Sequence, residues 1–457
     1  MTKKRIHLIA IGGSVMHNLA IALAKKGYQV TGSDDMITEP SRSRLMQHHL
    51  LPTTEGWNVN NIHADLDVVI LGMHAKADNP ELLKAQKMGI SIYSYPAYIY
   101  EQSKDKLRVV IGGSHGKTTI TAMIIHVLNY HGKNFDYLVG AQLDGFDTMV
   151  KLTEDAPWII IEGDEYLASP IDQRPKFHLY KADIAVLSGI AWDHINVFPT
   201  FETYKEQFVL FLETIKPRGT LIYCNEDTEL KRIVDGDLNN LIKIPYQIPD
   251  HQIESGITKL IVNKRKIPLQ IFGDHNLLNL TAAKFVCTAL GLQEENFYEA
   301  IQSFKGAAKR LELLGKNEHV VIFKDFAHSP SKVRATIHAV KTQYVNKKLI
   351  SVLELHTFSS LNETFLTQYA GTMDEADQVI IFCNEATLSH KGAKKIDLLA
   401  MNKFFRNLEL EYFSSPDNLE KYLSSLNYEN KVLLLMSSGN FGNMNLLTLK
   451  DKILSKY

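Results

Sequence analysis

Residues 111–120 read IGGSHGKTTI and directly follow the apolar run LRVV. Glycine has no Cβ, so the backbone amides around Gly112, Gly113 and Gly116 can converge closely on an anion. The next segment, TTITAMIIHVL, predicts a helix whose N-terminus directs its positive dipole end at the same anion. The stretch therefore predicts a phosphate-binding loop. It is a shortened one, because Ile111 stands where the ordinary P-loop has its first glycine.

Short apolar runs alternate with longer amphipathic stretches along the chain. The runs lie at residues 6–11, 28–33, 67–73, 108–113, 158–164, 184–190, 219–224, 319–326, 348–355, 378–384 and 432–438. This alternation is typical of parallel sheets covered by helices on both faces. The sequence therefore predicts an α/β fold.

Two segments suggest where domains begin and end. The polar stretch EQSKDK ends at residue 106, just before the strand that feeds the loop, and SFKGAAKRLELLG separates a helical segment from a new strand–helix alternation. We expect three domains. They are an N-terminal Rossmann-like domain at 1–106, a central P-loop-type nucleotide-binding domain at 107–308 and a C-terminal Rossmann-like domain at 309–457.

Composition limits the classes of protein to consider. The 457 residues carry 50 basic and 51 acidic side chains, so no global field favours nucleic acid or an anionic membrane. The three cysteines form no CxxC pair, which argues against a zinc knuckle or a disulfide framework. No apolar run approaches the ~18 residues of a membrane span. We expect a cytoplasmic protein that binds neither nucleic acid nor a membrane.

The loop itself supplies candidate ligands for a nucleotide and its metal ion. Lys117 is placed to reach the β- and γ-phosphates, and the Thr118 hydroxyl to bind Mg²⁺. The buried strand WIIIE ends at Glu162, where a carboxylate can serve the same hard cation. Asp164 and Glu165 follow, either as supporting groups or as a solvated turn. These patterns predict an ATP·Mg²⁺ site at one edge of the central sheet.

Two further motifs contain histidines. His194 follows the strand-like run AVLSGI, at the edge where open α/β sheets bind ligands, so a second metal site is the favoured interpretation. His275 and Asn276 stand near the start of a helix, where asparagine often caps. Their pattern alone gives no role in nucleotide binding.

The first thirty residues look like the opening of a dinucleotide-binding unit. The G-x-G-x-x-G pattern is not met at Gly12 and Gly13, but Asp34 closes the next strand, where a ribose-binding carboxylate belongs. A nicotinamide cofactor and a nucleoside diphosphate both fit this geometry.

Taken together, these stretches resemble the Mur ligase family, ATP-dependent enzymes that build the peptide stem of peptidoglycan. The motifs that carry the resemblance are Gly113-Ser114-His115-Gly116-Lys117-Thr118, Glu162-Gly163-Asp164-Glu165, Asp193-His194, Gly273-Asp274-His275-Asn276 and Asp325-Phe326-Ala327-His328-Ser329-Pro330. They follow the family's order through all three expected domains. The resemblance implies that ATP phosphorylates a carboxylate, which an amine then captures.

The resemblance also implies roles for individual residues. ATP would contact Gly113, Ser114, His115, Gly116, Lys117, Thr118, Thr119, His275, Asn276, Arg310 and Asp325. Mg²⁺ would be held by Thr118, Glu162 and His194, and the catalytic set would be Lys117, Glu162, His194 and His328, with His328 and Asp325 lining the amine side. UDP-N-acetylmuramate would contact Gly12, Gly13, Ser33, Asp34, Asn79 and Arg174. For Arg310 a surface linker and for Asn79 a turn before Pro80 are equally good interpretations.

The amine substrate distinguishes two branches of the family. DEYLASPIDQRPKFHLY at 164–180 resembles the branch that attaches the tripeptide L-Ala-γ-D-Glu-meso-diaminopimelate, so we expect this murein tripeptide rather than L-alanine, the alternative. Lys324, Ser329 and the segment HTFSS depart from the family pattern in the third domain. Two other classes remain as rivals, a nicotinamide-dependent oxidoreductase and a non-catalytic nucleotide-binding regulator.

Overall fold

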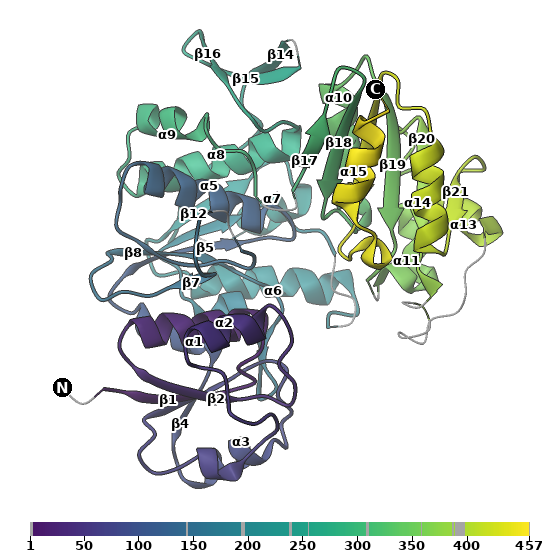
Figure 1. The fold of residues 1–457 in the computed structure, drawn as a ribbon. Helices are drawn as coiled ribbons and strands as arrows, with labels where there is room; N and C mark the ends of the chain where they lie inside the picture. The colour runs from purple at the N-terminus through teal and green to yellow at the C-terminus, as the bar shows by residue number, and fades with distance from the viewer. Residues whose placement is uncertain are drawn as a thin grey trace. The chain divides into compact units, whose positions relative to one another are not determined.

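The computed structural model describes residues 3–142, 145–192, 197–236, 240–254, 256–307, 310–357, 359–385, 388 and 398–456. These residues group into two units. The first unit holds residues 1–192, 197–247 and 281–300, and the second holds 248–280 and 301–457. Each unit combines sheets with flanking helices, as the ribbon in Figure 1 shows. The predicted α/β class is confirmed, and the residue bounds of the three expected domains stay a prediction.

The first unit begins with a four-stranded parallel sheet in the order β2-β1-β3-β4. Its strands are β1 (Arg5–Ile9), β2 (Gln29–Ser33), β3 (Val68–Leu71) and β4 (Ser91–Ser94), and its helices are α1 (Ser14–Lys25), α2 (Ser41–Gln47), α3 (Pro80–Lys87) and α4 (Tyr95–Gln102). β3 reads VVIL and is buried along its whole length, as a central parallel strand should be. The carboxyl ends of β1 and β2 therefore meet at one edge, since Ile9 pairs with Ser33.

A second sheet of the first unit has seven strands in the order β13-β12-β11-β5-β8-β6-β7. The strands are β5 (Leu107–Gly112), β6 (Asp136–Leu138), β7 (Val150–Lys151), β8 (Trp158–Glu162), β11 (Ile184–Leu187), β12 (Thr220–Cys224) and β13 (Ile242–Tyr246), with a separate hairpin of β9 (Leu167–Ser169) and β10 (Asp172–Pro175). The helices are α5 (Lys117–Tyr130), α6 (Phe201–Thr214), α7 (Thr228–Val234) and α9 (Glu294–Ile301), and α8 (Asp274–Ala289) contributes residues to both units. β5 lies between β8 and β11, in parallel with both.

The second unit is built on a six-stranded sheet in the order β17-β18-β22-β19-β20-β21, in which only β17 is antiparallel to its neighbour. Its strands are β17 (Glu312–Lys316), β18 (Val320–Asp325), β19 (Lys348–Glu354), β20 (Gln378–Phe382), β21 (Glu411–Phe413) and β22 (Lys431–Met436). An antiparallel trio, β14 (His251–Glu254), β15 (Ile257–Val262) and β16 (Arg265–Pro268), belongs to the same unit. The helices are α10 (Pro330–Gln343), α11 (Glu363–Leu366), α13 (Leu398–Phe405), α14 (Pro416–Ser425) and α15 (Leu446–Leu454).

Alternating residues of the six-stranded sheet form cores on both of its faces. Val321 and Phe323 pack on the face shared with α10 and α13, whereas Val320 and Ile322 pack with α14 and α15. Successive side chains of a strand point to opposite faces, so such strands must be apolar throughout. Within the described part of the chain, no helix has the length and apolarity needed to cross a membrane.

Candidate active site

The predicted phosphate loop lies between β5 and α5, in the middle of the seven-stranded sheet. Gly113 has φ +120°, and a Cβ at this position would lie 2.2 Å from the Ser188 hydroxyl oxygen. Gly116 has φ +74° and precedes the first residue of α5. Both backbone conformations favour glycine strongly, because an L side chain there is strained. The loop therefore keeps its backbone amides at the positive end of a helix, as anion binding requires.

Sheet order brings three segments together around this loop. Ile111 of β5 pairs with Glu162 of β8, and Gly112 pairs with Leu187 of β11. Because the strands are parallel, the residues after β5, β8 and β11 emerge at the same edge. The main-chain amide of Ser114 donates to the Gly189 carbonyl at 3.0 Å, which connects the loop after β5 to the loop after β11.

Thr118 and Glu162 lie side by side at this edge. The Thr118 hydroxyl donates to Glu162 Oε1 at 2.7 Å, and the Gly140 amide donates to Oε2 of the same carboxylate at 2.7 Å. A hydroxyl oxygen beside a carboxylate is the kind of donor pair that Mg²⁺ takes, with phosphate oxygens and water completing six ligands. Among the described residues no cluster of three His, Cys, Asp or Glu side chains could hold a metal ion.

The side chain of Lys117 folds back onto the loop as a partly buried cation, with 15% of its surface exposed. Its ammonium donates to the Gly113 carbonyl and to Glu165 Oε2, both at 2.7 Å. Burial lowers the pKa of Lys117, but the nearby carboxylates, led by Glu165, outweigh burial and leave the pKa raised. Lys117 is therefore positively charged at neutral pH. A fixed positive charge beneath the loop is what the β- and γ-phosphates of a nucleotide need.

In the N-terminal sheet, Asp34 contacts the loop between β1 and α1. Its Oδ2 accepts the Gly12 amide at 2.7 Å, and a Cβ on Gly12 would lie 2.9 Å from the same oxygen. The N-terminus of α1 begins at Ser14, directly after Gly13. Burial raises the pKa of the Asp34 carboxyl to about 6, and the neighbouring Asp35 adds to the shift, while the Gly12 hydrogen bond opposes it.

The raised pKa of Asp34 predicts a pH-dependent stability. A carboxyl group whose pKa is higher in the folded protein than in the unfolded chain stabilises the fold at a pH below its unfolded pKa, which is 3.8 for Asp34. That stabilisation is lost as the pH rises through the folded pKa of about 6. Relative to Asp34→Asn, the wild type should lose up to about 3 kcal/mol of unfolding free energy between pH 4 and pH 7. Urea unfolding of both proteins across this range measures the difference. The same pH dependence in both would contradict the assignment.

The remaining residues predicted to bind the UDP-sugar have partners inside the first unit. The buried Ser33 hydroxyl donates to Glu81, and the Asn79 amide oxygen caps α3 by accepting from Glu81 N at 3.0 Å and Leu82 N at 3.1 Å. Arg174 is exposed in β10 and pairs with Asp172 at 2.7 Å. Gly12, Gly13 and Asp34 are therefore the predicted residues that the structure gathers at one open loop.

Other predicted residues lie in the second unit, at the carboxyl end of β18. The Asp325 carboxylate accepts the amides of Leu311 at 2.6 Å and Ala327 at 2.7 Å. The Arg310 guanidinium lies over the Phe326 ring at 4.6 Å from its centre, and the His328 ring nitrogen Nδ1 lies 2.8 Å from the Phe326 carbonyl oxygen. Asp325 therefore fixes the loop that presents Arg310 and His328.

His275 is close to this group. Burial lowers the pKa of the His275 imidazole, and the Asp325 and Asp274 carboxylates act in the opposite direction. Asn276 is buried and its amide donates to the Phe272 carbonyl at 2.9 Å. The structure thus brings together the second-unit residues predicted to contact ATP, while His194 lies outside the described residues.

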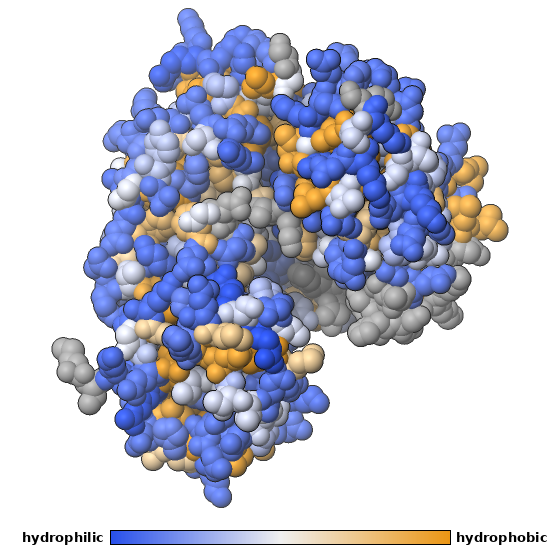
Figure 2. All heavy atoms as spheres, in the orientation of Figure 1, coloured by the Kyte–Doolittle hydropathy of each residue, from blue (hydrophilic) through white to orange (hydrophobic). Residues whose placement is uncertain are grey.

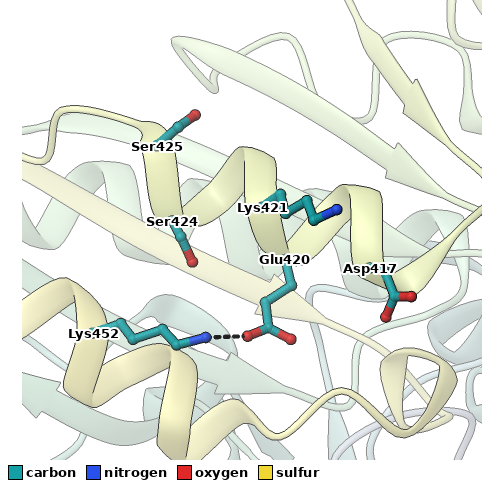
Figure 3. A pocket seen from close by; sticks show the side chains of 6 residues that line it. All are labelled: Asp417, Glu420, Lys421, Ser424, Ser425 and Lys452. Atoms are coloured by element: carbon teal, nitrogen blue, oxygen red, sulfur yellow. Dashed lines mark hydrogen bonds and ion pairs between the residues drawn. The ribbon is translucent and has the colours of Figure 1, made fainter.

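A surface pocket of about 560 Å³ lies elsewhere in the second unit, between α14 and α15. It is lined by Asp417, Glu420, Lys421, Ser424, Ser425 and Lys452. Figure 3 shows Glu420 and Lys452 facing one another, at 2.6 Å, and Figure 2 shows a mainly hydrophilic surface over α14. Of the lining charges, Glu420 and Lys452 pair with each other, and the lining includes none of the predicted site residues.

Comparison with known proteins finds matches over nearly the whole chain. Three family models match in order: the catalytic domain of the Mur ligase family at residues 5–106, the Mur ligase middle domain at 111–287 and the Mur ligase glutamate ligase domain at 309–439. The chain belongs to the Mur ligase family. It is an ATP-dependent ligase that forms an amide bond with release of ADP, in the biosynthesis of cell-wall peptidoglycan.

Sequence relatives and solved structures resemble the chain along its full length. A UDP-N-acetylmuramate–L-alanine ligase of Caldanaerobacter subterraneus is 30% identical over 96% of this chain and 95% of its own. A ligase of the same description from Carboxydothermus hydrogenoformans is 27% identical over 95% and 94%. Solved structures share the fold: a UDP-N-acetylmuramate–alanine ligase from Thermotoga maritima (TM-score 0.69, 19% identity, 99% of both chains) and a murein peptide ligase from Psychrobacter arcticus (TM-score 0.63, 21%, 99% and 98%).

These relatives overturn the predicted amine substrate. Expecting the tripeptide was wrong, because the sequence relatives at 27–30% identity are described as L-alanine ligases. The structure gives a physical reason why the segment at 164–180 misled. Arg174 is paired with Asp172, Lys176 with Asp164, and the Phe177 ring stacks on a core phenylalanine. Side chains that make contacts within the protein can match the residue pattern of a specificity motif without contacting a substrate.

Proposed function

We propose that this chain joins L-alanine to the lactyl carboxylate of UDP-N-acetylmuramate, with conversion of ATP to ADP and phosphate. The relatives described as L-alanine ligases support the choice of amine. The observation that carries the proposal is the loop at residues 113–118, with the Lys117 ammonium beneath it and the Thr118–Glu162 oxygen pair beside it. A shortened loop of this kind suits phosphoryl transfer to an acid.

The chemistry explains why the nucleotide is needed. A carboxylate is a poor acyl donor, because an oxygen dianion would have to leave it. Transfer of the γ-phosphoryl group to the carboxylate oxygen breaks the bond to ADP and forms an acyl phosphate. The neutral amine of L-alanine then attacks the carbonyl carbon, phosphate departs, and the amine proton passes to solvent or a base.

Residues of this chain would reduce the repulsion between the two anions of the first step. Lys117 would hold the β- and γ-phosphate oxygens, and the amides from His115 to Lys117 would donate to the same groups, whereas the Ser114 amide donates to the Gly189 carbonyl. Thr118 and Glu162 would hold Mg²⁺, which when bound neutralises phosphate charge and orients the transferred group. His194 is predicted to contribute to a second cation site.

The other predicted residues would bind the remaining parts of the substrates. Gly12, Gly13 and Asp34 are predicted to contact the UDP group of the sugar nucleotide at the N-terminus of α1. In the second unit, Arg310 and His275 are predicted to contact the nucleotide and His328 the amine. Ser33, Asn79 and Arg174 stay predictions as sugar-nucleotide contacts, because their side chains already have protein partners.

Phosphate release tests the proposal directly. With UDP-N-acetylmuramate and ATP, L-alanine should give a kcat/KM at least about ten-fold above that of glycine, which lacks one methyl group. UDP-N-acetylglucosamine is the matched control, because it lacks the lactyl carboxylate and should release no phosphate. A higher kcat/KM with the tripeptide L-Ala-γ-D-Glu-meso-diaminopimelate, or no amine-dependent release at all, would reject the proposal.

A further inference from the structure

The ammonium of Lys117 has three N–H donors, and the residues that the structure describes engage two of them. One donates to the Gly113 carbonyl and one to Glu165 Oε2, each at 2.7 Å. These two contacts hold the end of a flexible four-carbon side chain in one place, and they leave one donor for a phosphate oxygen. Glu165 is buried, with 1% of its surface exposed, so this carboxylate cannot be treated as part of a solvated turn.

Glu165 is itself held by a chain of hydrogen bonds with a defined direction. The Tyr204 hydroxyl donates to Glu165 Oε1 at 3.2 Å and lies 2.8 Å from Ser114 Oγ. A tyrosine has one hydroxyl proton, so Ser114 must be the donor in the second contact. Ser114 Oγ in turn accepts the Ala191 amide at 2.7 Å. The chain therefore runs from Ala191 through Ser114 and Tyr204 to Glu165, where Lys117 meets it.

The members of this network come from well-separated parts of the sequence and are held by the core. Tyr204 is fully buried on α6, with its ring 5.6 Å from that of Phe198 and 5.2 Å from that of Phe208. Ser114 is buried in the loop, and Ala191 follows β11. Hydrogen bonds to a buried carboxylate are strong because water does not compete for it.

We propose that Glu165 and Tyr204 are positioning residues for Lys117, which together set the place of its ammonium before a nucleotide arrives. The inference rests on the proposed role of Lys117 as a phosphate ligand. A lysine side chain carries roughly 2 kcal/mol of rotamer entropy. Ordering it in advance removes that cost from nucleotide binding, as for other preorganised sites. The same chain of bonds links the residues after β5, β8 and β11.

Nucleotides that differ only in phosphate number provide a specific test. Binding of AMP, ADP and a non-hydrolysable ATP analogue is measured by calorimetry for the wild type, Glu165→Gln and Tyr204→Phe. For Glu165→Gln we expect about 10–100-fold weaker binding of ADP and of the analogue, the range seen when a supporting hydrogen-bond partner is removed. Tyr204→Phe should weaken both about ten-fold. AMP affinity should not change, because Lys117 is placed to reach the β- and γ-phosphates.

Two matched controls separate positioning from general loss of structure. Asp136→Asn breaks another buried lysine–carboxylate pair of the first unit, with Lys106, and Tyr428→Phe removes another fully buried hydroxyl, which donates to Leu423 O at 2.8 Å. Both should bind all three nucleotides as the wild type does. If Glu165→Gln fails to fold, the nucleotide affinities of Tyr204→Phe, which removes a single oxygen atom, test the positioning role.

Three results would overturn the inference. They are an equal loss of AMP affinity, tighter binding of ADP in Glu165→Gln, and losses in the controls as large as in the two variants. The binding measurements need no amine. A wild type that binds ADP with the expected pattern of variants, yet makes no amide with L-alanine, would therefore reject the proposed function and leave the positioning role standing.

Discussion

Replacing Lys117 with alanine should abolish ATP-dependent amide formation and leave the fold intact. We expect kcat/KM for ATP to fall by about a thousand-fold or more, the upper range for removing one preorganised donor from a site of developing charge. The loss has two parts. The phosphates lose the ammonium beneath the loop, and Glu165, 1% exposed, is left as a buried negative charge facing them. Phosphate release under saturating sugar nucleotide and amine gives the rate, and circular dichroism gives the fold.

Lys133→Ala is the matched control for this variant, because Lys133 is exposed just after α5 and has no place in the loop. Its kcat/KM should equal that of the wild type. The double variant Lys117→Ala with Glu165→Gln should recover part of the affinity for ADP, since the unpaired carboxylate is gone. Turnover near the wild-type value in Lys117→Ala would remove Lys117 from the mechanism.

Replacing Glu162 with alanine should have the second largest effect. The Glu162 carboxylate accepts the Thr118 hydroxyl through one oxygen and the Gly140 amide through the other, so it is fixed at the position where a cation would be shared with ATP. We expect turnover to fall by about a hundred-fold or more, in line with the loss of one group that stabilises transition-state charge. The Mg²⁺ concentration for half-maximal rate should rise at the same time.

Glu154→Gln is the control for Glu162, because Glu154 is a largely exposed carboxylate of the same unit, paired with Lys26. Its Mg²⁺ titration should match that of the wild type. Chelation of divalent cations should stop turnover in all of these proteins. An unchanged Mg²⁺ requirement in Glu162→Ala would show that this carboxylate is not a cation ligand.

The central strands could be predicted because parallel strands buried on both faces must be apolar throughout. β3, β5, β8, β11, β19 and β22 coincide, to within one residue at their starts, with apolar runs in the sequence. Apart from β15, the strands that sequence reasoning missed are short, polar or at sheet edges. β16 reads RKIP and β17 reads ELLGK, so neither carries a long apolar signal, although each pairs with a strand next to it in the sequence.

The residues of the candidate site also divide into those that the sequence predicts and those that it does not. Gly113, Gly116 and Lys117 could be predicted because backbone conformation and charge act within one short loop. Tyr204 could not, since its partner Glu165 lies 39 residues away and its helix shows only ordinary amphipathic spacing. For Glu165 the sequence allows two roles, because it does not show which carboxylate after a buried strand turns inward. Burial decides that, and burial is a property of the folded chain.

The backbone at Gly113 also limits how this site can vary by mutation. Any substitution of this glycine introduces a side chain, whose first carbon would lie 2.2 Å from the Ser188 hydroxyl oxygen and 2.8 Å from the Ser188 amide nitrogen. Inhibitors that press against this turn should therefore select few escape variants at the turn itself. Resistance would have to arise at more tolerant positions around it.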